Sequence, residues 1–97
     1  MKPRVTVCTC ADGTFEILLN EAGRDPLVKE LLRLDRHWVH FHLDHHADPD
    51  IAEATDIGLS PIAYRGGDKV IEHGKVLLRP DDWDQQHFPN VVGSVGG

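Results

Sequence analysis

The sequence predicts an α/β domain with a mixed sheet of about four strands flanked by helices. The expected order is strand, helix, strand, helix, strand, strand, helix (β-α-β-α-β-β-α). Short β-rich runs alternate with segments of helical periodicity, which is typical of βαβ units. Two further strand-like runs flank a Gly-Gly pair, which favours an antiparallel hairpin. We expect one domain over residues 1–90 and a small, glycine-rich, mobile tail over residues 91–97.

The first strand is expected over the β-rich run from Arg4 to Cys10, which Ala11-Asp12-Gly13 ends. Two interpretations of the next segment remain open. In one, residues 14–22 form a helix. In the other, Ala11-Asp12-Gly13 is a three-residue hairpin loop and Phe15–Leu19 is a second strand. The expected element order contains a helix at this position.

The middle of the chain contains two Asp-Pro pairs, and each is typical of a helix start. Asp accepts hydrogen bonds from unpaired N–H groups, and Pro has no N–H to lose at the first helical position. Asp25-Pro26 thus predicts a helix that ends near Asp35, and Asp48-Pro49 predicts another that ends at Gly58. Between them, alternating polar and apolar residues predict a strand over His37–Leu43.

The last third predicts a hairpin and a short helix. Pro61 opens a strand over Ile62–Tyr64, where its missing N–H costs no sheet hydrogen bond. Gly66-Gly67 supplies the tight turn, and Lys69–Glu72 returns as the second strand. Pro80 suits the first position of the closing helix.

A helix, a small-residue loop, a proline that opens a strand, and a hairpin that ends near Gly74 together resemble the second half of a thioredoxin-fold protein. Glutaredoxins and the small glutaredoxin-like hydrogen donors are closest in size. The resemblance covers roughly residues 39–85. It implies a thioredoxin-like fold and a cis Ser60-Pro61 bond. It also implies that Ser60 and Pro61 face the redox cysteines and bind the substrate.

The usual Cys-x-x-Cys motif of that superfamily is absent, because Gly13 and Glu16 stand near its positions. The chain has two cysteines, Cys8 and Cys10, in a Cys-x-Cys pattern. In a regular strand such residues share a face about 6.5 Å apart, so a disulfide requires a bend after Thr9. The resulting small ring is strained and therefore easily reduced.

Two interpretations of these cysteines stay open. As a redox pair, Cys10 is the nucleophile and Cys8 resolves the mixed disulfide, because Cys8 lies in an apolar run. A following helix N-terminus would depress the pKa of Cys10 modestly. As structural residues, Cys8 belongs to the core and Cys10 has no thiol chemistry.

Two functional hypotheses follow. The first is a small thiol–disulfide oxidoreductase or electron donor that acts on protein thiols and disulfides through Cys10 and Cys8, with no cofactor. The alternative is a redox-inactive protein that binds a protein or peptide partner through the surface around Pro61, by adding an extended chain to an open backbone edge.

Composition restricts the partners and the compartment. The formal net charge of −6 over 97 residues argues against nucleic acid, which favours a basic face. It also favours a monomer, since like charges repel. No apolar run reaches membrane-spanning length, and the start lacks a signal-peptide core. We therefore expect a cytoplasmic protein without membrane contact.

Histidines form a second cluster, with five of seven between His37 and His46. His40 and His42 share a strand face, and His45 follows in a loop, so three imidazole ligands are conceivable. Their spacing matches no established metal motif, and we predict no metal site.

Overall fold

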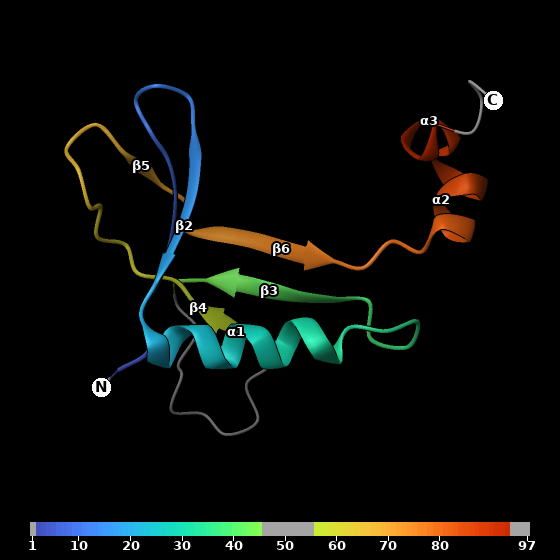
Figure 1. Cartoon of the computed structure of the whole chain (residues 1–97), viewed down its shortest axis with the longest axis horizontal. Coiled ribbons are helices and arrows are strands. Elements are labelled where there is room, and N and C mark those ends of the chain that lie inside the picture. Colours follow the sequence, from blue (N-terminus) through green and yellow to red (C-terminus); the bar gives the residue numbers. More distant parts are fainter. Residues whose placement is uncertain (1, 46–55, 94–97) are drawn as a thin grey trace.

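The computed structural model describes residues 2–45 and 56–93, and the structural statements below concern this part of the chain. It contains six strands and three helices (Figure 1). The strands are β1 (Val5–Thr9), β2 (Phe15–Leu19), β3 (His40–Asp44), β4 (Ile57–Gly58), β5 (Lys69–Val70) and β6 (His73–Leu77). The helices are α1 (Glu21–Arg33), α2 (Asp81–His87) and α3 (Pro89–Val92).

The strands form two three-stranded sheets. In the first, β1 lies between β2 and β5 and is antiparallel to both. In the second, β3 lies between β4, which is parallel to it, and β6, which is antiparallel. The α/β class is confirmed, whereas the single thioredoxin-like sheet of about four strands is wrong.

Residues 14–22 do not form the expected helix, because the turn before them closes a hairpin. Gly13 takes a left-handed φ of 87°, a conformation that glycine adopts at little cost. The N–H of Gly13 donates to the Cys10 carbonyl at 2.9 Å, and the N–H of Cys10 donates to the Thr14 carbonyl at 2.7 Å. Asp12 Oδ1 also accepts the N–H of Thr14 at 2.9 Å. The alternative with a three-residue loop and a strand over Phe15–Leu19 is therefore confirmed.

Helix α1 begins five residues earlier than the Asp25-Pro26 signal predicted. Asn20 is its N-cap, and Asn20 Oδ1 accepts the N–H of Gly23 at 2.7 Å. Pro26 lies inside the helix, where its ring removes one main-chain hydrogen bond. The predicted start is wrong because the Asn20 cap provides a local hydrogen bond that extends the helix upstream.

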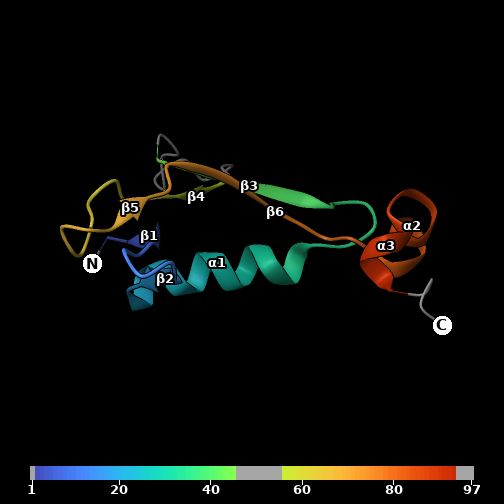
Figure 2. The same cartoon turned by 90° about the horizontal axis from the view of Figure 1, so that it is seen from above.

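The two sheets meet at the hydrophobic core. Two main-chain hydrogen bonds attach other segments to β1. The Ser60 N–H, after β4 of the second sheet, donates to the Val5 carbonyl, and the Ile71 N–H, after β5, donates to the Val7 carbonyl, both at 2.7 Å. Helix α1 runs alongside β3 and β6 on one side of the second sheet (Figure 2). The buried core consists of Val5, Val7, Phe41, Ile57 and Leu59, with Leu27, Leu34, Leu43, Ile71 and Val76 packed against it.

The region around Pro61 differs most from expectation. The Ser60-Pro61 bond is trans, so the predicted cis bond is wrong. Ile62–Tyr64 is irregular, and the returning segment pairs with β1 instead. Gly66-Gly67 does form a turn, closed by the Asp68 N–H and the Arg65 carbonyl at 3.1 Å. Neither glycine has a positive φ. The turn therefore lacks the backbone of the tight primed hairpin turns.

The helix predicted from Asp48-Pro49 begins outside the described residues. Its expected end at Gly58 lies in β4, which is a strand because Leu43 and Asp44 of β3 pair with Ile57 and Gly58. Asp44 also accepts the N–H of Leu59 through its backbone carbonyl at 3.0 Å.

Helices α2 and α3 lie at one end of the molecule, away from the first sheet (Figure 1). Pro80, predicted to be the first residue of this helix, is instead its N-cap, and α2 begins one position later at Asp81. The expected domain boundary at residue 90 falls within α3, and residues 94–97 lie outside the described part. Within that part, no helix combines the length and apolar character needed to cross a membrane.

Candidate functional site

The hairpin brings the two cysteine sulfurs to one side of β1. Cys8 is fully buried in the strand, and Cys10 is half-buried just beyond it, where the loop begins. Both are free thiols. The donor atoms of Cys8, Cys10, Glu16 and Asp68 all lie within 4.8 Å of one another. The two sulfurs are thus close neighbours, although a disulfide bond requires about 2.05 Å.

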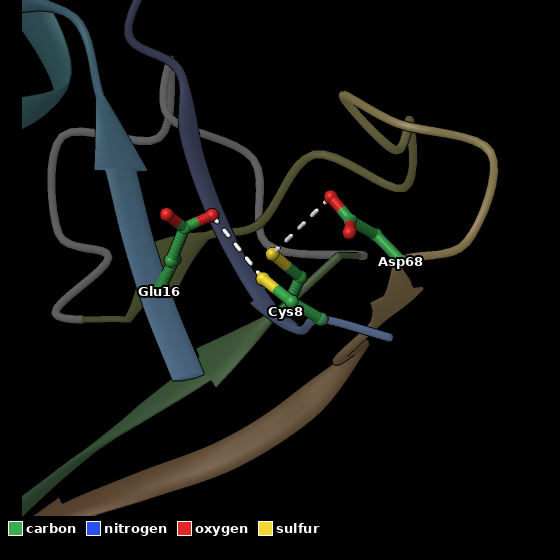
Figure 3. A group of neighbouring side chains, drawn as sticks. Cys8, Glu16 and Asp68 are labelled. Carbon is green, nitrogen blue, oxygen red and sulfur yellow. Dashed lines mark hydrogen bonds between the residues drawn. The ribbon is translucent and has the colours of Figure 1, made fainter. Parts of the chain in front are cut away.

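Two carboxylates approach this pair from different parts of the chain (Figure 3). Glu16 is the register partner of Cys8 on β2, and its Oε1 accepts the Cys10 thiol at 3.3 Å. Asp68 precedes β5, and its Oδ2 lies 3.8 Å from the Cys8 sulfur, a long contact. The Asp68 side chain is only 2% exposed. Each thiol thus has its own neighbouring carboxylate as a hydrogen-bond acceptor.

Arg65 links the two carboxylates to Cys10. Its Nε lies 3.0 Å from Asp68 Oδ2, and its Nη2 contacts Glu16 Oε1. The same Nη2 lies 3.4 Å from the Cys10 sulfur. Hydrogen bonds from Arg65 to these carboxylates raise the pKa of the guanidinium above its usual range. This fixed positive charge offsets the negative charge of both carboxylates.

The pKa of Cys10 is raised above its ordinary value. A hydrogen bond with Thr14 lowers it, but desolvation and the hydrogen bond and charge of Glu16 outweigh that effect, with a further contribution from Asp68. The modest depression expected from a helix N-terminus is therefore wrong, because a strand follows Cys10 and places a carboxylate beside it. Arg65 lowers the pKa of Glu16 by hydrogen bonding, which keeps that carboxylate ionised.

Cys10 also lines an open pocket of about 350 Å³ between the hairpin loop and the segment before β5. Asp12, Thr14, Glu16, Arg65 and Asp68 line it as well. The four sulfur and oxygen donors resemble a cation site in composition. The guanidinium of Arg65 already provides positive charge there, so the arrangement suits thiol chemistry better than metal binding.

Ser60 and Pro61 join β1 at its opposite end. The Ser60 N–H bonds to Val5, five residues before Cys10, which corresponds to about 16 Å along a strand. Pro61 is exposed, and Ser60 Oγ accepts the N–H of Ile62 at 3.3 Å. The cysteine pair therefore has Glu16, Arg65 and Asp68 as its neighbours, rather than the predicted Ser60 and Pro61.

The sequence alone did not identify these three residues as neighbours of the cysteines. Glu16 was hidden by the helix interpretation, since its position opposite Cys8 depends on the hairpin. Asp68 and Arg65 come from a turn about 60 residues away, and the sequence has no signal that β5 pairs with β1. The signal that was available is Asp12-Gly13 after a β-rich run, which favours a hairpin loop.

The histidines also group differently from expectation. His40 and His42 share an exposed face, with ring centroids 5.1 Å apart. In the described residues, His45 joins Asp44 and His73, whose donor atoms lie within 4.8 Å of one another. His73 was not singled out from the sequence, because it reaches this site through the pairing of β3 with β6.

Comparisons of the chain with protein-family models, with curated proteins and with solved structures return no match.

Proposed function

We propose that the protein is a small thiol–disulfide exchange protein in which Cys8 and Cys10 alternate between a dithiol and a disulfide. One observation carries the proposal: two reduced sulfurs lie within 4.8 Å of each other on one side of the hairpin, where Cys10 lines an open pocket and Cys8 is fully buried. A disulfide requires the sulfurs to approach to about 2.05 Å. Cys10 lies just beyond the end of β1 at Thr9 and beside the hairpin loop, so that approach requires a change only at the end of the strand.

In the first step, the Cys10 thiol loses its proton and the thiolate attacks one sulfur of a substrate disulfide. A bond forms between Cys10 and that sulfur, and the other substrate sulfur leaves as a thiolate that takes up a proton. Cys10 is suited to this step because it lines the pocket, whereas Cys8 is fully buried. Glu16 accepts the Cys10 thiol hydrogen, but Arg65 lowers the pKa of Glu16, so the proton passes to solvent in the open pocket.

In the second step, the Cys8 thiolate attacks the Cys10 sulfur and releases the remaining substrate thiol. Asp68 is positioned to accept the Cys8 proton, because its Oδ2 faces that sulfur from a buried position. In total, two thiols of this protein are oxidised to one disulfide, and one substrate disulfide is reduced to two thiols. Two electrons and two protons pass to the substrate.

The raised pKa of Cys10 favours the role of electron donor over that of oxidant. A strong oxidant is stabilised in its reduced form, which a low thiol pKa promotes. Here the carboxylates disfavour the Cys10 thiolate, and the reduced form therefore gains little stabilisation from ionisation of this thiol. When formed, a thiolate of higher pKa is also the stronger nucleophile.

The test combines redox equilibration with alkylation. We expect the reduced, folded protein to react with limiting iodoacetamide at Cys10 well before Cys8. In glutathione buffers of graded composition, the wild type should form an internal disulfide, seen by mass spectrometry as the loss of two hydrogens. Cys8→Ser should instead accumulate a mixed disulfide with glutathione at Cys10, and Cys10→Ser should accumulate neither product.

Two results would overturn the proposal. One is the absence of an internal disulfide at every glutathione ratio. The other is resistance of both thiols to iodoacetamide until the protein is denatured, since this would identify Cys8 and Cys10 as purely structural residues.

A second candidate function has its own observation. Ile62 is 73% exposed and Tyr64 is 49% exposed, and both follow exposed Pro61 in an irregular segment. Exposed apolar side chains on such a segment favour contact with an extended peptide. In a selection from a peptide library, binders of this surface should be lost with Ile62→Asp and retained with Cys10→Ser. Peptides that bind both variants equally would exclude it.

A further inference from the structure

One face of the second sheet gathers imidazole and carboxylate groups. In the antiparallel pairing of β3 with β6, Asp44 is the register partner of His73, and His42 is the register partner of Lys75. Directly paired residues point to the same side of a sheet, as do alternate residues along one strand. His42, Asp44, His73 and Lys75 therefore share a face, independent of the cysteine pair.

Three donors converge at the end of this face. His73 Nδ1 lies 3.4 Å from Asp44 Oδ1, and His45 Nδ1 lies 3.8 Å from the same oxygen. The two imidazole rings have centroids 5.1 Å apart. One donor atom from each residue lies within 4.8 Å of the others. Donors bound to one metal ion at about 2.0–2.2 Å must lie within roughly 4.4 Å of one another, so small side-chain rotations are sufficient.

Backbone contacts hold His45 in place. Its N–H donates to the Glu72 carbonyl at 3.0 Å, and its ring Nδ1 lies 3.4 Å from the same oxygen. The backbone hydrogen bond anchors His45 beside Asp44, and the ring contact is long for a hydrogen bond, so a small ring rotation turns Nδ1 toward the ion. The side chains of His45 and Asp44 are 22% and 34% exposed, and that of His73 is 64% exposed. An ion can therefore approach from the His73 side.

We propose that Asp44, His45 and His73 bind a divalent transition-metal ion of the zinc, cobalt or nickel type. Two imidazoles and one carboxylate suit these ions, and with three protein ligands a further coordination position is taken by water or another ligand. The groups beside the site also suit a small ligand on the ion. An open pocket of about 440 Å³ is lined by Asp44 and His73, together with His42, Asp56 and Lys75.

The carboxylates of Asp44 and Asp56 and the ammonium of Lys75 line this pocket, so its fixed charge is negative when the imidazoles are neutral. Asp56 Oδ1 lies 3.4 Å from His42 Nδ1, and Lys75 lies across from His42, one alternate position from His73. Lys75 disfavours a cation in its immediate vicinity, so the ion sits at the Asp44 end. Its ammonium instead favours an anionic group on the open coordination position.

The probe is Co²⁺, added to the full-length Cys10→Ser protein, because this substitution removes one thiol from the competing sulfur site. We expect one equivalent to bind, with visible absorption bands and without the near-ultraviolet band of cobalt–thiolate bonds. In the Cys10→Ser background, the further substitution His73→Ala should weaken Co²⁺ binding by about tenfold or more, as should the shape-preserving Asp44→Asn. Adding His37→Ala, an exposed histidine outside the cluster, should leave the affinity unchanged.

The proposal is overturned if Cys10→Ser binds no Co²⁺, or if both the His73→Ala and Asp44→Asn variants bind it as tightly as their parent. A cobalt–thiolate band in Cys10→Ser would place the ion at Cys8 and also overturn it. Circular dichroism of each variant separates a lost ligand from a lost fold. Thiol exchange plays no part in these measurements, so they test the metal site independently of the proposed function.

Discussion

The guanidinium of Arg65 lies 3.4 Å from the Cys10 sulfur, and it also donates hydrogen bonds to Glu16 and Asp68. A cation this close to a thiol ordinarily lowers the thiol pKa. Here the pKa of Cys10 is raised: a hydrogen bond with Thr14 lowers it, but desolvation and then the Glu16 carboxylate, which accepts the thiol hydrogen and repels the thiolate, outweigh that effect. Glu16 is thus the nearby charge that opposes Arg65 at this thiol.

We therefore expect Glu16→Gln to accelerate alkylation of Cys10 at neutral pH. The substitution removes a negative charge beside the sulfur and releases Arg65 Nη2 to stabilise the thiolate. In the wild type, the alkylation rate should still be rising above pH 8.5, the ordinary thiol pKa, and the variant's profile should lie at lower pH. The measurement is the rate of iodoacetamide labelling against pH, followed by mass spectrometry.

Glu21→Gln is the matched control, since it makes the same charge change at an exposed residue of the first turn of α1. It should leave the profile of Cys10 in place. A Glu16→Gln profile that coincides with that of the wild type would show that the carboxylate does not control the thiol.

The hairpin around Cys10 shows what could be predicted locally. The sequence identified the first strand, the Ala11-Asp12-Gly13 turn and both alternatives for residues 14–22. The helix was preferred only because of the family resemblance. The deciding interactions were within four residues, namely Asp12 with Thr14 and the left-handed Gly13. In this region, turn chemistry was the better guide.

The long-range pairings could not be predicted in the same way. Asp68 reaches Cys8 because β5 pairs with β1, and His73 reaches Asp44 because β6 pairs with β3. Both are contacts between distant parts of the chain whose register depends on how the whole core packs. Local patterns near Pro61 predicted a hairpin between Ile62–Tyr64 and Lys69–Glu72. In the structure, Lys69–Val70 pairs with the edge of β1 instead.

Acid should destabilise the fold through carboxylates that accept main-chain hydrogen bonds. Backbone N–H groups of His37 and Trp38 lower the pKa of Asp35, and hydrogen bonds with Thr14 lower that of Asp12. A depressed folded-state pKa contributes stability above the unfolded value of about 3.9, and this stability disappears as the pH falls through the folded value. We expect these two groups to leave the melting temperature unchanged from pH 7 to about 5 and to lower it below about 4. Asp35→Asn should make the acid decline shallower, and an identical decline in wild type and variant would exclude the role of Asp35.

Asn20 should be important for stability because one side chain holds both the start of α1 and the N-terminal segment. Its Oδ1 accepts the N–H groups of Gly23 at 2.7 Å and Arg4 at 2.9 Å, and its Nδ2 donates to the Lys2 carbonyl at 2.9 Å. Loss of a helix cap typically costs about 0.5–2 kcal/mol, and we expect Asn20→Ala to lie toward the upper end. Urea unfolding measures the change. Asn90→Ala, in exposed α3, is the control and should have little effect; equal effects of both substitutions would contradict the capping role.

Gly23 should tolerate no side chain, because α1 approaches the backbone of Arg4 there. A Cβ on Gly23 would overlap the Arg4 carbonyl oxygen and come within 2.9 Å of its carbonyl carbon. Backbone atoms cannot move aside without displacing β1, so we expect Gly23→Ala to cost about 1–3 kcal/mol despite the better helix propensity of alanine.

Gly66 provides the matched substitution, since a Cβ there meets no atom within 4 Å and its φ is not positive. Gly66→Ala should be neutral or stabilise by up to about 1 kcal/mol through the unfolded state. Urea unfolding of the two variants should therefore give free-energy changes of opposite sign or clearly different size. A Gly23→Ala protein as stable as the wild type would show that α1 does not approach the Arg4 backbone this closely.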